Sequence, residues 1–77
     1  MRAAVAQIEI KEYPSGSRYE GKVNQHGYRH GKGVFSYSSG NRYVGEFRNN
    51  MCHGHGTKTY ANGRVESGQW ENNSFLG

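Results

Sequence analysis

The sequence predicts an all-β fold, an elongated single sheet of about six antiparallel strands arranged as repeated β-hairpins. Glycine and aromatic residues recur at nearly fixed offsets, and turn signals separate short segments along the chain. Apolar residues make up only 32% of the 77 positions, too few for a core between two layers. The six Tyr, three Phe and one Trp must therefore supply most of the packing.

The repeat is clearest after Gly40. The offsets +3, +5, +7, +14, +16 and +20 from this glycine carry Tyr43, Gly45, Phe47, Gly54, Gly56 and Tyr60. Counting from Gly16 or Gly63 reproduces most of this pattern, with one residue inserted in the first copy. The chain is therefore divided into a flexible lead over 1–7, a partial repeat over 8–15, repeat 1 over 16–39, repeat 2 over 40–62 and a truncated repeat 3 over 63–77.

The segment from Ile8 to Tyr13 alternates apolar and charged residues, which predicts a half-buried strand. A turn at Pro14–Gly16 ends this strand. Counted back from the turn, Ile10 holds the position of Val34 and Thr57 in the later repeats. The strand is therefore interpreted as the second half of an incomplete preceding repeat.

One kind of turn follows a tyrosine and ends in glycine, at Pro14–Gly16, Ser38–Gly40 and Ala61–Gly63. Within the last of these, Asn62 and Gly63 are a strong signal for a type I′ hairpin turn, in which both central residues have positive φ. The residues from Ser38 to Gly40 also fit a three-residue loop. The strand register beside this kind of turn therefore stays open.

The other kind of turn is predicted as a two-residue loop, at Asn49–Asn50 and again at Asn72–Asn73. The first loop gives the pairs Arg48–Met51, Phe47–Cys52, Gly45–Gly54 and Tyr43–Gly56. The second loop gives the pairs Trp70–Phe75 and Gly68–Gly77. In the first repeat the inserted residue makes a three-residue loop, Gln25–Gly27, which sets Gly21 opposite Gly31 and Tyr19 opposite Gly33.

These pairings give the strand glycines a role. Glycine weakens a strand unless another group approaches its backbone closely. A neighbouring aromatic ring can lie across the bare glycine, an arrangement known as aromatic rescue. The sequence therefore predicts that one face of the sheet is lined by rings, which contact one another from repeat to repeat.

Repeat 2 contains Tyr43-x-Gly45-x-Phe47, then Asn50, then His53-Gly54-x-Gly56. This pattern resembles the MORN repeat (membrane occupation and recognition nexus), and partial copies occur in repeats 1 and 3. The resemblance covers residues 8–77. It implies a MORN-type hairpin array that acts as an interaction module, in a scaffold or beside an enzyme domain such as a lipid kinase or a SET methyltransferase.

Three features depart from the MORN pattern. Val23 stands at the aromatic position of repeat 1, which also carries the insertion, and Glu66 stands at the tyrosine position of repeat 3. Because of Glu66, repeat 3 is expected to pack least well. Glu66 marks an end repeat or faces a basic residue of a partner.

The residues that could carry chemistry do not form a catalytic or metal-binding set. Cys52 and His53 are adjacent on a strand and so point to opposite faces. The sequence has no Asp to orient a histidine, and its carboxylates are scattered. Of the histidines, only His30, His53 and His55 are expected to meet on one face, without the fourth ligand of a zinc site. We therefore predict no enzyme activity, no metal and no cofactor.

The formal net charge of +4 suggests a second interpretation. Arg18, Arg42 and Arg64 follow the turn glycines and are expected to project in a row, where they would contact anionic membrane lipid. Six Glu interrupt the positive field, which favours an ordinary solvated surface instead. Nucleic acid is an unlikely partner because the aromatic rings are committed to the glycines.

The leading hypothesis is a noncatalytic scaffold module that binds a helix, a peptide or a second copy through its aromatic face and open edges. The residues predicted to contact the partner are Tyr19, Tyr43, Phe47, Trp70 and Phe75. Alternatives are a peripheral membrane or phosphoinositide binder, and an accessory segment of a multidomain enzyme. The single Cys52 and the lack of an apolar span favour a cytoplasmic location. The resemblance to MORN repeats implies a place at cytoskeletal, ciliary or membrane-associated structures.

Overall fold

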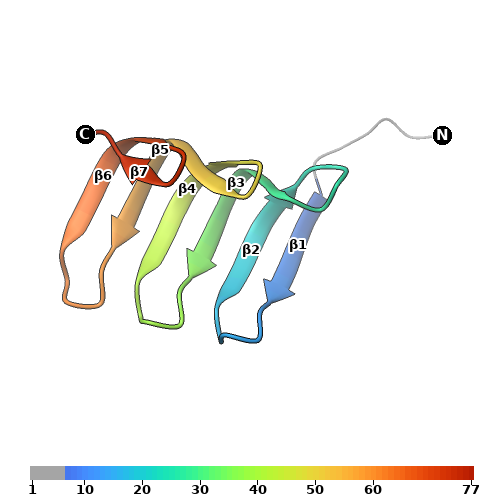
Figure 1. Ribbon diagram of the computed structural model, residues 1–77, viewed down its shortest axis with the longest axis horizontal. Coiled ribbons are helices and arrows are strands. Elements are labelled where there is room, and N and C mark those ends of the chain that lie inside the picture. The colour runs from blue at the N-terminus through green and yellow to red at the C-terminus, as the bar shows by residue number, and fades with distance from the viewer. Residues whose placement is uncertain (1–6) are drawn as a thin grey trace.

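Residues 7–77 fold as one open antiparallel sheet of seven strands in chain order (Figure 1). The computed structural model describes residues 7–77. The strands are β1 Gln7–Glu12, β2 Arg18–Val23, β3 Arg29–Ser36, β4 Arg42–Arg48, β5 Met51–Thr59, β6 Val65–Glu71 and β7 Ser74–Phe75. The prediction of an all-β single sheet is confirmed, and the short strand β7 makes the number of strands seven.

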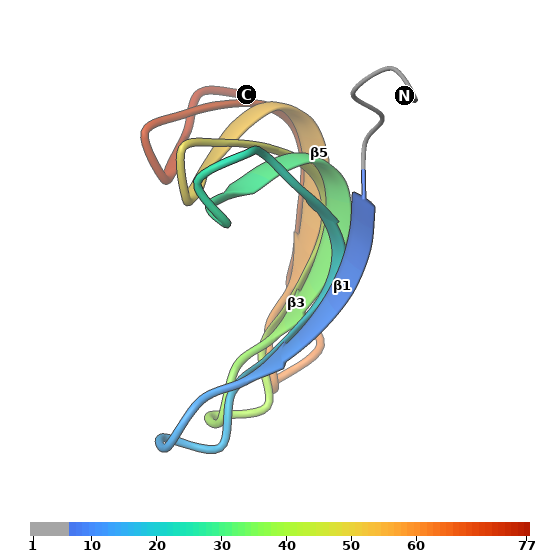
Figure 2. The same cartoon turned by 90° about the vertical axis from the view of Figure 1, so that its right-hand side faces the viewer.

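Of the lead predicted over residues 1–7, residues 1–6 lie outside the described residues, and Gln7 is already the first residue of β1. The described part measures 47 × 28 × 15 Å along its principal axes. Seen from the end, the sheet is strongly curved, and the loops at the top of Figure 1 lean over its concave side (Figure 2). Within residues 7–77 the structure has no helix that could cross a membrane.

The lower turns of Figure 1, after Tyr13, Tyr37 and Tyr60, are all three-residue loops. In the middle one, the Tyr37 N–H donates to the Asn41 carbonyl at 2.9 Å, and the Gly40 N–H donates to the Tyr37 carbonyl at 3.0 Å. The type I′ turn predicted at Asn62–Gly63 is wrong. Gly63 has a φ of +94°, whereas Asn62 is not among the residues with positive φ, so this turn follows the same three-residue form.

The upper turns have the predicted forms. Asn49 and Asn50 have φ of 48° and 74°, and Asn72 and Asn73 have φ of 49° and 72°, so both are two-residue turns of type I′. In the first repeat, the Asn24 N–H donates to the Tyr28 carbonyl at 3.0 Å and closes a three-residue loop.

The predicted register is correct beside the upper turns and wrong farther along the strands. The pairs Phe47–Cys52 and Trp70–Phe75 are confirmed. However, Gly45 faces Gly56 instead of Gly54, and Tyr43 faces Lys58 instead of Gly56. The first hairpin shows the same shift: Gly21 faces Gly33 instead of Gly31, and Tyr19 faces Phe35 instead of Gly33.

A β-bulge causes this shift. Between the pairs Phe47–Cys52 and Gly45–Gly56, the single residue Glu46 of β4 faces three residues of β5. Gly54, in the middle of the three, has a φ of +90°, which favours glycine. In the last hairpin, Gly68 and Gly77 are not paired directly, because Gln69 exchanges hydrogen bonds with Leu76 and Gly77. The bulges increase the curvature of the sheet and so create its concave side.

Candidate functional site

The centre of repeats 1 and 2 is a tyrosine ring that lies across the backbone of a glycine on the next strand. Tyr43 covers Gly56, and Tyr19 covers Gly33. A Cβ atom added at Gly33 or Gly56 would overlap the phenol ring. The covering of Gly56 by Tyr43 was predicted, although the two residues are not a direct cross-strand pair.

The tyrosine hydroxyls satisfy carbonyl groups at the bulges. The Tyr43 hydroxyl donates to the Glu46 carbonyl at 2.8 Å, and the Tyr19 hydroxyl donates to the Lys22 carbonyl at 2.5 Å. These carbonyls lie where the regular strand pairing is interrupted. Each tyrosine therefore covers a glycine and also stabilises the bulge beside it.

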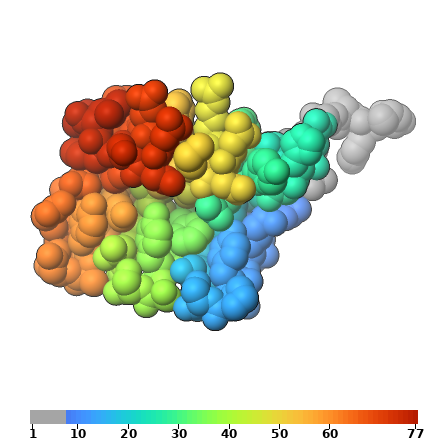
Figure 3. Space-filling model, in the orientation of Figure 1, coloured from blue at the N-terminus to red at the C-terminus, as the bar shows by residue number. Residues whose placement is uncertain are grey.

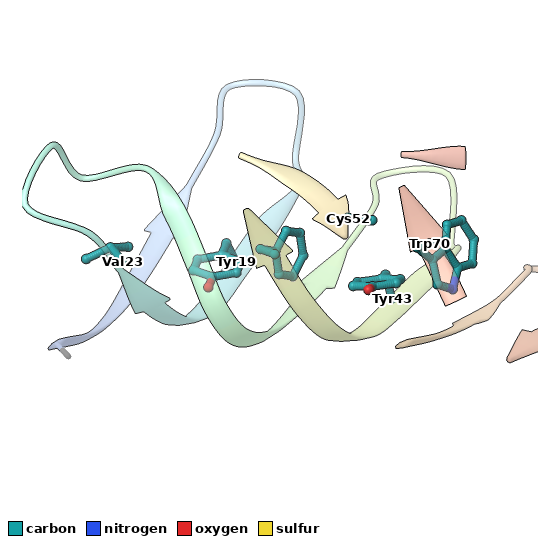
Figure 4. Packing of buried hydrophobic residues seen from close by; sticks show 6 residues of the cluster. Tyr19, Val23, Tyr43, Cys52 and Trp70 are labelled. Carbon is teal, nitrogen blue, oxygen red and sulfur yellow. The ribbon is translucent and has the colours of Figure 1, made fainter. Parts of the chain in front are cut away.

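The rings form one continuous row along the concave side (Figure 4). Tyr19 packs edge-on against Phe47 with ring centroids 5.2 Å apart, and Phe47 packs edge-on against Tyr43 at 5.0 Å. Tyr43 then packs against Trp70 at 5.4 Å. The Trp70 indole N–H donates to the Gly56 carbonyl at 3.0 Å. This row is the hydrophobic core, because a single sheet buries side chains only on the side toward which it curves.

The burial of these rings bears on the predicted partner contacts. Tyr19 and Tyr43 are 0% exposed, and Phe47 and Trp70 are each 4% exposed. A partner therefore cannot contact these four rings while the sheet keeps this shape. Phe75 is 36% exposed and packs on Trp70 with centroids 5.1 Å apart, so it is accessible at the C-terminal edge.

Two asparagines join neighbouring repeats. Asn50 accepts a hydrogen bond from the Arg29 N–H through its side-chain oxygen at 2.8 Å, and its own N–H donates to the Arg29 carbonyl at 2.9 Å. Asn73 makes the same pair of bonds with Cys52, at 2.8 and 3.0 Å. The equal position of the two asparagines in their repeats is the sequence signal for this role. Because two asparagines also suit a type I′ turn, their sequence pointed to the turn and not to the contact between repeats.

Comparison with known families agrees with this geometry. The model of the MORN repeat matches residues 19–42 and 43–63, so each match begins at a glycine-covering tyrosine. The chain belongs to the MORN-repeat family. No curated protein matches the chain. The MORN repeat is a noncatalytic module, and no catalytic family was found in this chain.

Outside the core, the MORN repeats carry a second row of rings on the concave side, half-buried instead of buried. We call it the outer ladder: Tyr13, Phe35, Tyr37, Lys58 and Tyr60. Tyr13 stacks on Phe35 with centroids 5.8 Å apart, and Phe35 packs on Tyr37 at 4.6 Å. The Lys58 ammonium lies 4.9 Å from the Tyr37 centroid and 5.0 Å from that of Tyr60. The ladder therefore crosses three lower turns without a break.

Arg29 connects the outer ladder to the core. Its guanidinium carbon lies 4.8 Å from the Phe35 ring centroid, and its Nη1 donates to the Tyr13 hydroxyl at 2.8 Å. The Nη2 atom donates to the Asn50 carbonyl at 2.7 Å. Such cation–π contacts are favourable where the cation is partly shielded from water. Arg29 therefore contacts residues of the partial repeat, of repeat 1 and of repeat 2.

The arginines predicted to contact lipid do not form one row. Arg18 and Arg42 share a register position on the convex side, separated by Ser36. Arg18 is paired with Glu12 at 3.8 Å and Glu20 at 3.5 Å. Arg64 instead lies over the Tyr60 ring at 4.7 Å and is bonded to Glu66 at 2.8 Å.

Another group of basic side chains surrounds an open hollow of about 410 Å³ beside the upper turns. The basic residues that line it are Lys22, His30, Lys32, Arg48 and His53, with Glu46 as the one acid. Among the described salt bridges, none involves Lys22, Lys32 or Arg48. The His53 Nδ1 atom is buried without a partner among residues 7–77. Among residues 7–77, no cluster of three or more His, Cys, Asp or Glu side chains could hold a metal ion.

Cys52 lies in the core and His53 lines the hollow, so the two do not form a nucleophile–base pair. Burial raises the pKa of the Cys52 thiol, and only 3% of the residue is exposed. Alkylation of Cys52 by iodoacetamide at pH 7.5 should be about 100-fold slower in the folded protein than in guanidinium chloride. Equal rates in the two conditions would show that the thiol is accessible and contradict its place in the core.

Buried phenols should make the protein unstable in alkali. Burial raises the pKa of Tyr19 to about 12, and it raises that of Tyr43 as well. An unfolded tyrosine ionises near pH 10, so above this pH ionisation favours the unfolded state. Stability should therefore be complete below pH 10 and fall as the pH rises from 10 to 12, by on the order of 2 kcal/mol for Tyr19.

Guanidinium unfolding between pH 8 and 12 tests this expectation. The Tyr19→Phe variant should lose stability less steeply with pH than the wild type does. Tyr28 is 46% exposed, so Tyr28→Phe is the matched control and should keep the wild-type slope. Parallel curves for the wild type and Tyr19→Phe would contradict the burial of the Tyr19 hydroxyl.

Proposed function

We propose that this chain is a noncatalytic MORN module that binds a helix or an extended peptide along its concave side. The observation that supports this proposal is the outer ladder. The four core rings are used by the fold, whereas the ladder presents half-exposed aromatic edges over three repeats. Aromatic residues of this kind supply much of the binding energy at protein interfaces.

The charges of the ladder favour an acidic amphipathic partner. Lys58 lies between Tyr37 and Tyr60, and Arg64 lies over Tyr60. An amphipathic helix would place its apolar side chains on the rings and its carboxylates beside these cations. The scaffold role follows from this mode, since a rigid curved sheet holds its partner without a change of fold.

Selection from a phage-displayed library of acidic helical peptides tests the proposal. Selected peptides should bind the wild type and lose at least about tenfold in affinity to Lys58→Glu and to Tyr60→Ala, because both changes remove ladder contacts. Val44→Ala, on the convex side and 47% exposed, is the matched control and should bind normally. Peptides that bind both ladder variants with wild-type affinity would exclude this surface.

A second candidate function is the binding of anionic membrane lipid. It is supported by the basic hollow, whose Lys22, Lys32 and Arg48 are free of described salt bridges. Each basic residue near an anionic surface contributes about 1 kcal/mol, so three can give salt-sensitive binding. The hollow is a better candidate than Arg18, which already has two carboxylate partners.

Co-sedimentation with vesicles of phosphatidylcholine containing phosphatidylserine and a phosphoinositide tests this candidate. The variant Lys22→Gln/Lys32→Gln/Arg48→Gln should lose binding, and Arg18→Gln/Arg42→Gln should lose less. Binding of the wild type should also disappear at 0.5 M salt, a concentration that reduces the Debye length to about 4 Å. Failure of the wild type to sediment with these vesicles at low salt would exclude the lipid function.

A further inference from the structure

We infer that Asn62 is a modification site, at which the side-chain amide is lost spontaneously and replaced by a carboxylate. The reaction needs only water and the neighbouring residue Gly63. This site is independent of the proposed functions, because it follows from the sequence and the geometry of one lower turn. The modification also changes the outer ladder, since Tyr60 closes the same turn.

Asn62 differs from the other asparagines in the residue that follows it. The chain contains seven asparagines: Asn24, Asn41, Asn49, Asn50, Asn62, Asn72 and Asn73. Only Asn62 precedes a glycine. A backbone nitrogen can attack the side-chain carbonyl carbon of the asparagine before it, and a side chain on the attacking residue hinders this approach. Because glycine has no side chain and the widest choice of backbone conformations, Gly63 supplies the least hindered nucleophile.

The turn folds the Asn62 side chain back onto the backbone with which it would react. The Arg64 N–H donates to the Asn62 Oδ1 atom at 2.9 Å. This bond reaches past Gly63, so it keeps the side-chain carbonyl beside the Gly63 backbone. A donor on this oxygen also stabilises the negative charge that develops there when a nucleophile adds to the carbon. The turn therefore holds the two reacting groups close together and assists the attack.

The turn is exposed and can open without disturbing the core. The residues from Ala61 to Arg64 are all exposed. Apart from chain neighbours, no described atom lies within 4 Å of a Cβ atom built on Gly63. The Gly63 N–H donates to the Tyr60 carbonyl at 2.8 Å, and this bond must break before the nitrogen can attack. Since no residue of the turn belongs to the buried core, the reaction can proceed in the folded protein.

The reaction conserves atoms and requires no oxidant or reductant. Hydroxide or a buffer base removes the proton from the Gly63 nitrogen, which then bonds to the side-chain carbonyl carbon of Asn62. The bond from this carbon to the amide nitrogen breaks, and the amide nitrogen takes up a proton and leaves as ammonia. Water then opens the resulting cyclic imide at either carbonyl. The products are aspartate and isoaspartate, in which the backbone runs through the side-chain carbons.

Both products change the surroundings of Tyr60. Each adds a carboxylate two residues before Arg64, whose guanidinium carbon lies 4.7 Å from the Tyr60 ring centroid. Isoaspartate also lengthens the backbone of the turn, which the Tyr60 N–H closes by donating to the Arg64 carbonyl at 2.8 Å. The modified protein should therefore bind acidic peptides more weakly at the outer ladder, a consequence that rests on the proposed function.

Asn24 provides an internal comparison. Its Oδ1 atom accepts hydrogen bonds from the His26 N–H at 2.9 Å and from the Tyr28 N–H at 3.1 Å, so its side chain is folded back in the same way. The residue after Asn24 is Gln25 and not glycine. Asn62 should therefore be converted at least about tenfold faster than Asn24, because the side chain of Gln25 hinders the approach of its nitrogen.

Incubation of the 77-residue protein at pH 8 and 37 °C, followed by tryptic digestion and mass spectrometry, tests this site. Trypsin releases Asn62 and Asn24 in separate peptides, residues 59–64 and 23–29. The first peptide should gain one mass unit and separate into aspartate and isoaspartate forms. Asn62→Gln is the matched control and should keep its mass, and an unincubated sample corrects for conversion during digestion. Loss of the amide from Asn62 no faster than from Asn24 would overturn the inference.

The Gln25→Gly variant tests the role of the folded-back side chain. It places a glycine after Asn24, so Asn24 should now be converted at a rate within about tenfold of that of Asn62. An Asn24 that keeps its amide in this variant would contradict the geometric basis of the site.

The Asn62→Asp variant tests the effect on the outer ladder, because it reproduces one of the two products. It should bind the selected acidic peptides more weakly than the wild type does. Equal binding would overturn the effect on the ladder. If no peptide binds the wild type, the proposed function fails, whereas the loss of the amide is still decided by the mass of the peptide 59–64. The two proposals can therefore fail separately.

Discussion

Replacing Gly56 with alanine should destabilise the protein by about 2–3 kcal/mol, a large effect for the addition of one methyl group. The added carbon would overlap the Tyr43 ring and its hydroxyl, which lie against the Gly56 backbone. Gly56 does not have a positive φ, so the destabilisation would come from this overlap and not from backbone strain. Urea unfolding followed by tryptophan fluorescence measures the change. Trp70 is the single tryptophan, is buried in the core and donates to the Gly56 carbonyl, so its fluorescence should change when this region unfolds.

A double-mutant cycle distinguishes this overlap from a general effect of alanine in a strand. In a Tyr43→Leu background the ring is absent, so Gly56→Ala should be at least about 1 kcal/mol less destabilising than in the wild type. Lys32→Ala, at an exposed position of β3, is the control and should change stability by less than about 0.5 kcal/mol. Additive effects of the Tyr43 and Gly56 changes would contradict the contact.

Replacing Tyr43 with alanine should destabilise the protein by about 3–5 kcal/mol, as expected for a fully buried aromatic side chain. A domain of ordinary stability has about 5–15 kcal/mol in total, so this variant should lose a large share of its stability. The loss is large because the ring contacts both Phe47 and Trp70 and therefore joins repeat 2 to repeat 3.

The conservative variant separates the ring from its hydroxyl. Tyr43→Phe keeps the ring over Gly56 and removes only the hydrogen bond to the Glu46 carbonyl, so it should be destabilised by about 1 kcal/mol. Differential scanning calorimetry of the two variants measures both effects. Equal melting temperatures for Tyr43→Ala and Tyr43→Phe would show that the ring is not packed as described.

The sequence was sufficient to predict the hairpins and the upper turns. Asn49–Asn50 and Asn72–Asn73 favour type I′ turns through their own backbone preferences, and this is a local property. The register away from these turns could not be predicted, because a bulge depends on which glycine adopts positive φ. Gly54 and Gly56 occupy similar positions in the sequence, but only Gly54 has positive φ. The difference comes from the neighbouring strand β4, whose Tyr43 ring lies over Gly56.

The candidate site was predicted less well than the fold. Tyr43 and Trp70 were correctly expected on an aromatic face, but the sequence does not reveal how strongly the sheet curves. The curvature buries these rings and leaves the outer ladder half-exposed in their place. The basic hollow was missed because its residues come from four strands, with Lys22 on β2 and Arg48 on β4. Their convergence depends on the same bulges.

The ring over the glycine is the feature on which the fold, the burial of the core and the exposure of the outer ladder all depend. Proton NMR tests it most directly. The structure predicts cross-peaks between the Tyr43 ring protons and the Gly56 α protons, with the latter shifted upfield by the ring current, and the same for Tyr19 and Gly33. Cross-peaks from Gly45 to Gly54 instead of Gly56, with unshifted Gly56 α protons, would contradict both the register and the ring position.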